Sequence, residues 1–352
     1  TNFDITANVD NGTCIYCVYG CTNTTMFNYN PLATCNNGTC VPVVLGCMDP
    51  LAFNYDASAN TDNGSCVPPA SGCAGTTAIP DSNFETKLIA LGIDSGSIDG
   101  FVDNANICSL GSLNIPSSSV SDLTGIEGFI SLFAMSVTGN QLTSLNVTQN
   151  TGLSSLLNCD FNQLTTIDTS QNPLLRHFYC KDNQLTSLDL SNNTNLEKLS
   201  CQNNLLTSLD VSNSPVLVTL QANSNQLTSV NTTGAIDLVI FLMPSNLVTS
   251  LDLSTNIILA KLVCSNNLLT GSLNLSNNPN LGMLTVDNNF LTSITLSDAI
   301  PSSTFANFAL NAQNNDASLV IHVGATAGRV ALAQSLFTVG NGSISTGTTF
   351  AV

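Results

Sequence analysis

The chain has 352 residues, of which 8% are charged, and 23 acidic residues against six Lys plus Arg give a net charge of -17. Nucleic acid and anionic membrane surfaces require a basic footprint, so this balance argues against both as partners. Hydrophobic residues make up 43% and recur periodically, which predicts a buried core. No apolar run approaches the ~20 residues of a membrane span, so we expect no membrane insertion. The first residues already lie within a repeat, and we expect a mature or excised part of a longer chain.

Thirteen cysteines fall into two groups. Eight lie at regular spacings within residues 1–73, and four of the other five belong to a later repeat. Dense cysteines in a short segment are typical of disulfides in an oxidising compartment. We therefore expect an extracellular location, on a cell or virion surface. A zinc site is the weaker alternative, because this segment has no His and no second CxxC motif.

Residues 1–73 repeat with a period of 26, as the copies at 20–40 and 46–66 show. Units this small need covalent cross-links because they cannot hold a core. The spacing predicts the pairs Cys21–Cys40 and Cys47–Cys66, with Cys17–Cys35 and Cys73–Cys108 pairing the remaining cysteines and no partner for Cys14. Each of the first two bridges should stabilise the folded repeat by roughly 3 kcal/mol, because it closes a loop of the unfolded chain.

Oxygen-bearing side chains in the second copy suggest calcium, since hard cations take several oxygen ligands. The candidate ligands are Asp49, Asp56, Asn60 and Asp62. The alternative is that Asn, Asp and Gly simply form turns here. These units resemble the GC-DP-A-NY-DGSC repeats of surface proteins from marine bacteria of the Bacteroidetes type and from some large viruses. That resemblance covers residues 1–73 and implies no known chemistry.

Residues 74–131 are predicted to cap a stack of repeats. The stretch 79–94 is expected to form one helix, with Ser82 and Glu85 as a capping box and an apolar stripe formed by Phe84, Leu88 and Leu91.

From residue 132 to residue 296 the chain repeats about every 21 residues, and the period is marked by Asn140, Asn162, Asn183, Asn204, Asn225, Asn246, Asn267 and Asn289. Around Asn183 the residues follow L-x-x-L-x-C-x-x-N-x-L, and the same pattern begins again at Leu185. These nested patterns resemble the bacterial IRREKO class of leucine-rich repeats. The sequence therefore predicts a mainly β leucine-rich-repeat solenoid, in which the Asn side chains bond backbone groups of adjacent turns.

The position three residues before each of these asparagines is apolar. It holds Cys159, Cys180, Cys201 and Cys264 in some turns and Val, Ala or Met in others. We expect these four cysteines to be reduced and buried, because in-register parallel neighbours are poorly placed for a bridge. Cross-linking between turns is the alternative.

Two strands are expected in each turn. One repeats LTSLDL almost unchanged, with an outward row of Asp and Asn residues that suits solubility better than a calcium row. The solvent-facing residues of the other strand vary from turn to turn. Its candidate binding patch consists of Arg176, His177, Tyr179, Lys181 and Lys198. Four of the six cations, at 176, 181, 198 and 261, lie on or near this strand. The patch suits an anionic glycan or an acidic protein loop, and the alternative is ordinary charge scatter.

Residues 297–352 lose the repeat and are expected to form a C-terminal cap or a linker to a following segment. A strand is predicted over 318–324, a short helix over 327–337, and a strand or linker from 341.

No catalytic motif accompanies the two His residues at 177 and 322, and this argues against an enzyme. The sequence favours an adhesion or recognition module that binds protein or glycan on another surface. The rival hypothesis is a self-associating structural subunit of a surface filament or virion. A hydrolase domain lying outside this sequence is a third. Nine Asn-x-Ser/Thr sequons matter only if the host glycosylates asparagine.

Overall fold

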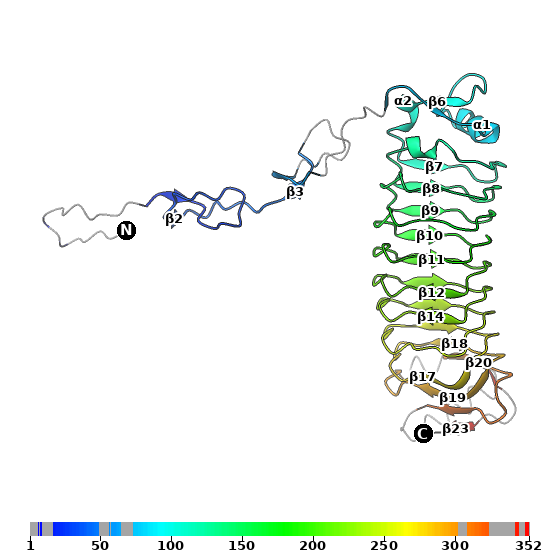
Figure 1. Ribbon diagram of the computed structural model, residues 1–352. Helices are drawn as coiled ribbons and strands as arrows, with labels where there is room; N and C mark the ends of the chain where they lie inside the picture. The colour runs from blue at the N-terminus through cyan, green and yellow to red at the C-terminus, as the bar shows by residue number, and fades with distance from the viewer. Residues whose placement is uncertain are drawn as a thin grey trace. The chain divides into compact units, whose positions relative to one another are not determined.

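The computed structural model describes residues 6, 8, 17–48, 56, 58–64, 73–301, 308–323, 342–344 and 349–351. The chain divides into two compact units, Thr1–Ala74 and Gly75–Val352. This division falls within one residue of the predicted boundary at 73. Each unit is described separately (Figure 1).

The N-terminal unit consists of small repeats with very short strands. Strand β1 (Tyr19–Gly20) pairs in parallel with β2 (Cys35–Asn36), and β3 (Leu45–Gly46) pairs in parallel with β4 (Thr61–Asp62). The second pair is the first displaced by 26 residues, so the sequence period is also the structural period. Among the described residues of this unit, Cys21 and Cys47 alone are buried apolar side chains.

Disulfides hold these repeats together. They join Cys17 to Cys35 and Cys21 to Cys40, with Cα–Cα distances of 5.4 and 4.9 Å. These are the pairings that the spacing predicts. Cys47, Cys73 and Cys108 are also disulfide-bonded, whereas Cys14 and Cys66 lie outside the described residues.

The second unit begins with a cap in which β5 (Thr76–Ala78) pairs antiparallel with β6 (Phe101–Asp103). Helix α1 spans Ser82–Ala90, α2 spans Asn104–Ile107, and the 3-10 helix η2 spans Ile126–Gly128. The predicted helix forms, and Phe84 and Leu88 are buried. Phe84 stacks on Phe129 with ring centroids 6.1 Å apart.

Two details predicted for α1 are wrong. The N-cap is Asp81 and not Ser82, because the Asp81 carboxylate accepts hydrogen bonds from the backbone N–H groups of Asn83 and Phe84. Glu85 makes no capping box, since its buried carboxylate accepts from the N–H groups of Asp99 and Gly100 at 2.6 and 2.9 Å. Leu91 is the C-cap residue and is exposed, so it does not continue the apolar stripe.

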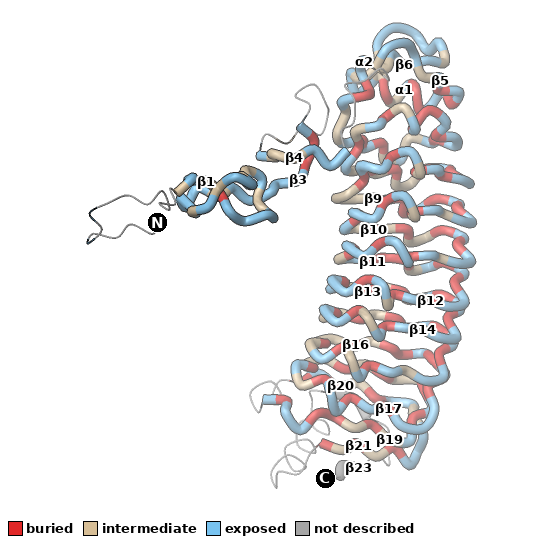
Figure 2. Tube along the Cα trace, turned by 60° about the vertical axis from the view of Figure 1, so that its left-hand side comes forward, coloured by how far each residue is buried: buried red, intermediate tan, exposed pale blue. Residues whose placement is uncertain are grey.

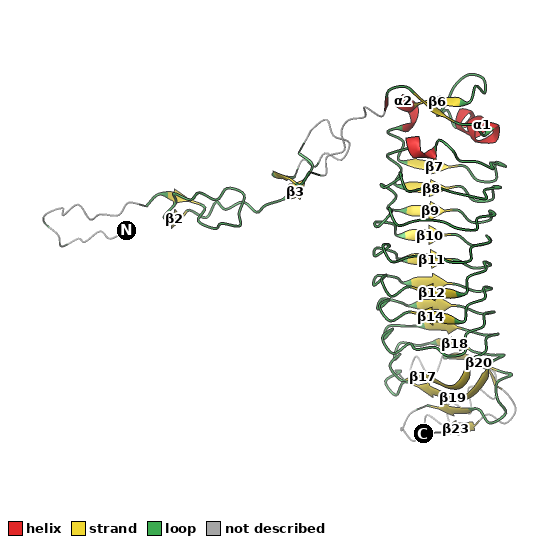
Figure 3. Ribbon diagram, viewed as in Figure 1, coloured by secondary structure: helices red, strands yellow, loops and turns green. Residues whose placement is uncertain are grey.

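Below the cap the chain winds into a stack of turns, each contributing one strand to an eleven-stranded parallel sheet (Figures 1 and 3). We call the solvent-facing side of this sheet the variable face. Its strands are β7 (Ser112–Asn114), β8 (Ala134–Ser136), β9 (Leu156–Asn158), β10 (His177–Tyr179), β11 (Lys198–Ser200), β13 (Thr219–Gln221), β15 (Ile240–Leu242), β16 (Lys261–Val263), β18 (Met283–Thr285), β20 (Ala309–Ala312) and β22 (Gly342–Ile344).

The LTSLDL segments line a second side of the stack, which we call the repeated face. A strand in every turn was predicted, but here the ladder is interrupted. Strands form as β12 (Ser208–Asp210) with β14 (Ser229–Asn231), and as a four-stranded sheet of β17 (Thr270–Leu275), β19 (Phe290–Leu296), β21 (Val320–His322) and β23 (Thr349–Ala351). Earlier, Asn146 and Asp168 form a single bridge. An Asx turn follows most of these segments, both where a strand forms, as at Asp210, and where none does, as at Asp189.

The stack extends beyond the predicted repeat limits of 132 and 296. Strand β7 precedes them, and β20 and β22 continue the same sheet after them. The strand predicted over 318–324 is β21, whereas the helix predicted over 327–337 lies outside the described residues.

Leucines from both sides meet in one continuous core, with buried segments recurring in every turn (Figure 2). The periodic asparagines bond backbone groups of adjacent turns, as predicted. The Asn183 amide donates to the carbonyls of Cys159, Cys180 and Lys181, and its oxygen accepts from the N–H of Leu164 at 2.9 Å. Each turn is thereby bonded to the previous one, and the polar groups buried between the turns are satisfied.

A second asparagine ladder lies on the opposite edge of the core. Asn150, Asn172, Asn193, Asn256 and Asn278 are fully buried and donate to carbonyls of the preceding turn. The Oδ1 atoms of Asn193 and Asn256 accept from the hydroxyls of Thr169 and Thr232, both at 2.9 Å. The Oδ1 atoms of Asn150, Asn172 and Asn278 have no partner. The Asn172 amide donates to the Val147 carbonyl, and the Asn278 amide donates to the Leu253 carbonyl. Neither Val147 nor Leu253 carries a hydroxyl that could donate to the asparagine oxygen.

Candidate recognition surface

The parallel register of the eleven-stranded sheet brings the predicted patch together. His177 lies beside Lys198, and Tyr179 lies beside Ser200, which is followed by Gln221. The middle residue of each strand points into the core. The first and third residues therefore line the variable face.

One half of the patch is organised around Glu197, a residue that the sequence did not single out. Its carboxylate accepts from the Arg176 guanidinium at 2.6 Å and lies 3.6 Å from Nε2 of His177. The rings of His177 and Tyr179 stack with an interplanar angle of 4° and centroids 6.3 Å apart. Burial and the nearby Lys198 ammonium lower the pKa of His177, which favours the neutral imidazole.

The other half is organised around Asp160, which was also not predicted. Its carboxylate accepts from the backbone N–H of Lys181 at 2.8 Å and lies 3.9 Å from the Lys181 ammonium. Burial raises the pKa of Asp160 to about 6, even though both contacts with Lys181 lower it. The Lys181 ammonium also lies 4.7 Å from the centre of the Phe161 ring. Asp160 could have been identified from the repeat, because it lies one repeat of 21 residues before Lys181.

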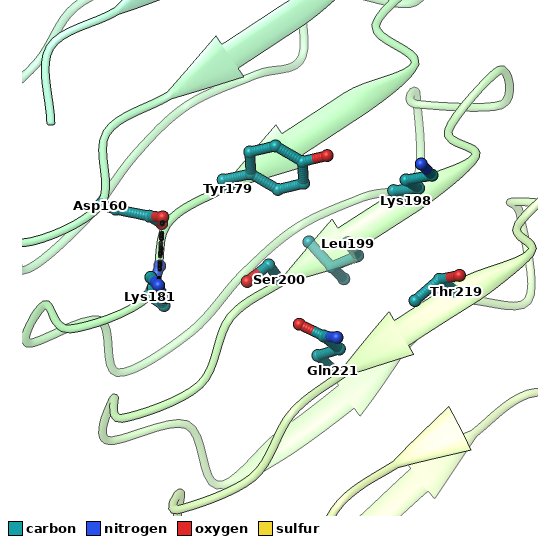
Figure 4. Close-up of a pocket in the computed structure, with 8 residues that line it drawn as sticks. All are labelled: Asp160, Tyr179, Lys181, Lys198, Leu199, Ser200, Thr219 and Gln221. Carbon is teal, nitrogen blue, oxygen red and sulfur yellow. Dashed lines mark hydrogen bonds and ion pairs between the residues drawn. The ribbon is translucent and has the colours of Figure 1, made fainter. Parts of the chain in front are cut away.

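Between these groups lies a shallow hollow of about 340 Å³ (Figure 4). Its polar lining comes from strands β10, β11 and β13 and from the residues that follow β9 and β10. These polar residues are Asp160, Tyr179, Lys181, Lys198, Ser200, Thr219 and Gln221. The Ser200 hydroxyl donates to the Gln202 side chain, whose amide donates to Gln221 at 2.7 Å. The floor is thus a fixed array of polar groups, and burial raises the pKa of the Tyr179 hydroxyl, which keeps it protonated.

Towards the C-terminus the variable face changes from polar to apolar. Ile240, Leu242, Val263 and Met283 are half-buried on the adjacent strands β15, β16 and β18, with Lys261 among them. We call these four residues the apolar region. Since β13 pairs with β15, the apolar region is continuous with the hollow.

The repeated face has a hollow of similar volume lined by Asp168, Ser170, Asp189 and Ser191, among others. Each carboxylate there accepts a hydrogen bond from the serine two residues later, and these bonds lower the pKa values of Asp168, Asp189, Asp210 and Asp252. The aspartates of this row therefore form turns of the repeat.

The residues proposed for calcium in the N-terminal unit are also used in local bonds. Asp56 accepts from Ser58, and Asp62 accepts from the N–H of Gly64. Asn60 accepts from the N–H of Val44 and donates to the Pro42 carbonyl. Asp49 lies outside the described residues. Within the described part of the chain, no group of three or more His, Cys, Asp or Glu side chains is arranged to hold a metal ion.

The four cysteines of the repeat, Cys159, Cys180, Cys201 and Cys264, are buried and free. Burial raises the pKa values of Cys201 and Cys264 to about 12 and raises those of Cys159 and Cys180 as well. They are unreactive core side chains in the folded state. None of the helices in the described ranges is long and apolar enough to cross a bilayer.

Comparison with known proteins gives structural matches only. Neither a family model nor a curated sequence matches the chain. The functional domain of InlJ from Listeria monocytogenes, reported to include a cysteine ladder, is 22% identical, with a TM-score of 0.38 over 77% of this chain and 81% of that one. The internalin InlF from the same species is 18% identical, with a TM-score of 0.46 over 78% and 92%.

The leucine-rich-repeat domain of APL1B is 16% identical, with a TM-score of 0.52 over 76% of this chain and 81% of that domain. At this level of identity the similarity establishes the fold, which is a leucine-rich-repeat solenoid.

Proposed function

We propose that this leucine-rich-repeat chain is an extracellular, non-enzymatic recognition module that binds a partner protein through its variable face. The observation that supports this most strongly is the distribution of charge. In a chain with net charge -17, four of the six Lys and Arg residues lie on or beside this one surface. Clustered cations on an acidic molecule steer an acidic partner towards them. The disulfides of the N-terminal unit support an oxidising location.

A protein segment suits the surface better than a glycan. Specific protein interfaces combine an apolar centre with a polar rim, and Tyr and Arg are enriched among their strongest contacts. Here the apolar region adjoins the Tyr179 hollow, and Arg176 directly precedes the strand β10 that carries Tyr179. A bound segment would place acidic side chains near Lys198 and apolar side chains over Leu242 and Val263. An anionic glycan would use the cations and leave the apolar region uncovered.

The test is selection of a displayed library of random 12-residue peptides on the immobilised native chain. We expect enrichment of sequences that carry acidic residues followed or preceded by apolar ones. A Tyr179→Ala, Lys198→Ala double variant should lose the enrichment without a change in melting temperature, because both side chains are solvent-facing. Ser187→Ala on the repeated face is the matched control. Equal enrichment on wild type and double variant would exclude the variable face.

Self-association is the competing function, and electron microscopy of the native chain with and without calcium separates the two. Single particles under both conditions support recognition of another molecule. Ordered filaments or lattices in which the Tyr179 face is buried would contradict the proposal.

A further inference from the structure

One position in each of ten described turns of the solenoid has a left-handed backbone, with a φ angle between 47° and 70°. In nine of these turns the position lies directly before an asparagine, whereas in the first turn Ser117 precedes Ser118. The residues there are Ser117, Gly139, Phe161, Asp182, Asn203, Ser224, Ser245, Asn266, Asn288 and Asn314. Glycine, Asn and Asp tolerate this conformation, and a bulky side chain does so at a cost. Nine of the ten positions hold Gly, Asn, Asp or Ser, and only Phe161 departs from the pattern.

The fold gains little from the Phe161 side chain. Its φ is 55°, and it is 51% exposed, so the ring is not part of the core. Among the described residues, the ring stacks on no other aromatic ring, and its cation–π contact with the Lys181 ammonium at 4.7 Å is a weak interaction at an exposed site. The backbone bond at this position, from the Phe161 N–H to the Lys181 carbonyl, needs no side chain and recurs in other turns. Strain that is not offset by burial is characteristic of functional positions.

Phe161 lies next to the hollow of the variable face. It follows Asp160 directly, and Lys181 both contacts its ring and lines the hollow. The ring therefore extends the Tyr179 surface past its polar rim. Exposed aromatic side chains beside a cation are typical anchors of protein interfaces.

We propose that Phe161 is a specificity-determining contact for the partner, an inference that rests on the proposed function. The partner segment would place an aromatic or aliphatic side chain on the Phe161 ring and a carboxylate between Lys181 and Lys198. Lys181 is held in position for this by Asp160, whose carboxylate accepts from its backbone N–H. Partners without an apolar side chain next to the acidic one bind more weakly, because they gain no free energy from covering the ring.

The decisive variant is Phe161→Asn, which restores the residue type found at Asn203, Asn266 and Asn288. Relief of the left-handed strain should raise the melting temperature by roughly 2 °C. The same variant should weaken binding of a library-enriched peptide at least tenfold. A residue with a structural role would lose stability and binding together, so opposite changes in the two are the signature of a contact residue.

Asn314→Phe is the matched control, because Asn314 has the same conformation, φ 53°, and is exposed on a turn beyond the apolar region. It should lower the melting temperature and leave binding unchanged. The proposal is overturned if Phe161→Asn lowers the melting temperature, or if it leaves affinity unchanged while Tyr179→Ala weakens it. If neither variant affects binding, or if no peptide is enriched, the proposed function fails as well.

Discussion

The two units of this chain use the same residue types in opposite ways. In the N-terminal unit, Cys21 and Cys40 form a covalent link, whereas in the solenoid Cys180 and Cys201 are reduced core side chains. Among the described asparagines of the N-terminal unit, bonds reach at most 18 residues along the chain, as from Asn60 to the Pro42 carbonyl, and none joins a buried core. The ladder asparagines of the solenoid also bond groups of the adjacent turn, which for Asn183 lie 19 and 24 residues away. Unit size explains the difference, because only stacked turns enclose a core that can bury such groups.

The largest effect is expected where the solenoid depends on its long-range asparagines. Replacing Asn183 by Ala leaves the Leu164 N–H without a partner and removes one of the two side-chain donors to each of the carbonyls of Cys159 and Cys180. The free energy of unfolding should fall by about 4 kcal/mol, since a buried unsatisfied group costs about 1–3 kcal/mol and each lost hydrogen bond about 1 kcal/mol. Denaturant unfolding measures this. Asn192→Ala is the control, because Asn192 is exposed and bonds only the Ser170 carbonyl at 3.2 Å. An equal loss in both variants would contradict the ladder's role.

The next effect should separate the two units. A Cys21→Ser, Cys40→Ser double variant should destabilise its own repeat by roughly 3 kcal/mol and leave the unfolding transition of the solenoid unchanged. Hydrogen exchange over residues 17–40 and over residues 130–290 follows the units separately. Loss of hydrogen-exchange protection in the solenoid as well would contradict the claim that the disulfide stabilises only the N-terminal unit.

A smaller effect is expected within the second asparagine ladder. Thr169→Val should cost about 2 kcal/mol, because it leaves the Oδ1 atom of buried Asn193 without its hydrogen bond. Val147→Thr should instead stabilise the fold by about 1 kcal/mol, because it offers a hydroxyl to the unpartnered Oδ1 of Asn172. Melting of the two variants against wild type decides the point. Shifts of the same sign would show that these hydroxyls do not act through the asparagines.

The smallest effect concerns Asp160, a buried carboxylate of the solenoid. A hydrogen bond from Ser58 lowers the pKa of exposed Asp56, whereas burial raises the pKa of Asp160 to about 6. The folded state therefore binds the Asp160 proton more tightly than the unfolded chain does. The stability that this proton contributes is present at low pH and is lost as the pH rises from about 4 to 6.

Asp160→Asn should remove this dependence, which amounts to about 1 kcal/mol because solvent reaches the hollow. Denaturant titrations of variant and wild type at pH 4, 5, 6 and 7 measure the difference. Wild type should lose stability relative to the variant across this range. A relative gain would show that the Lys181 contacts outweigh burial.

Most of the solenoid could be predicted from the sequence because its signals recur. The asparagine period gives the turns, and the Leu, Cys and Val positions give the inward face. The cap was harder, because Asp81 and Ser82 both suit an N-cap and only the long-range bonds of Glu85 decide between them. The interrupted strands of the repeated face were not predicted, because nearly identical segments form a strand in some turns and none in others.

The binding surface could be predicted only in part. Residues of unusual type, such as His177 and Tyr179, are visible against a uniform repeat. Glu197 and Asp160 were missed because their importance comes from pairing across turns, which the residue type alone does not show. Phe161 could have been found from its column, where every other residue is small or polar, but only the φ angles show why that column matters.

The measurement that tests the central claim most directly is calorimetric titration of one library-enriched peptide against three forms of the chain. These are wild type, Tyr179→Ala on the variable face, and Ser187→Ala on the repeated face. The variable face is predicted to bind the partner, so Tyr179→Ala should weaken the affinity at least tenfold and Ser187→Ala should leave it unchanged. Equal affinities for wild type and Tyr179→Ala, or a loss confined to Ser187→Ala, would contradict the assignment.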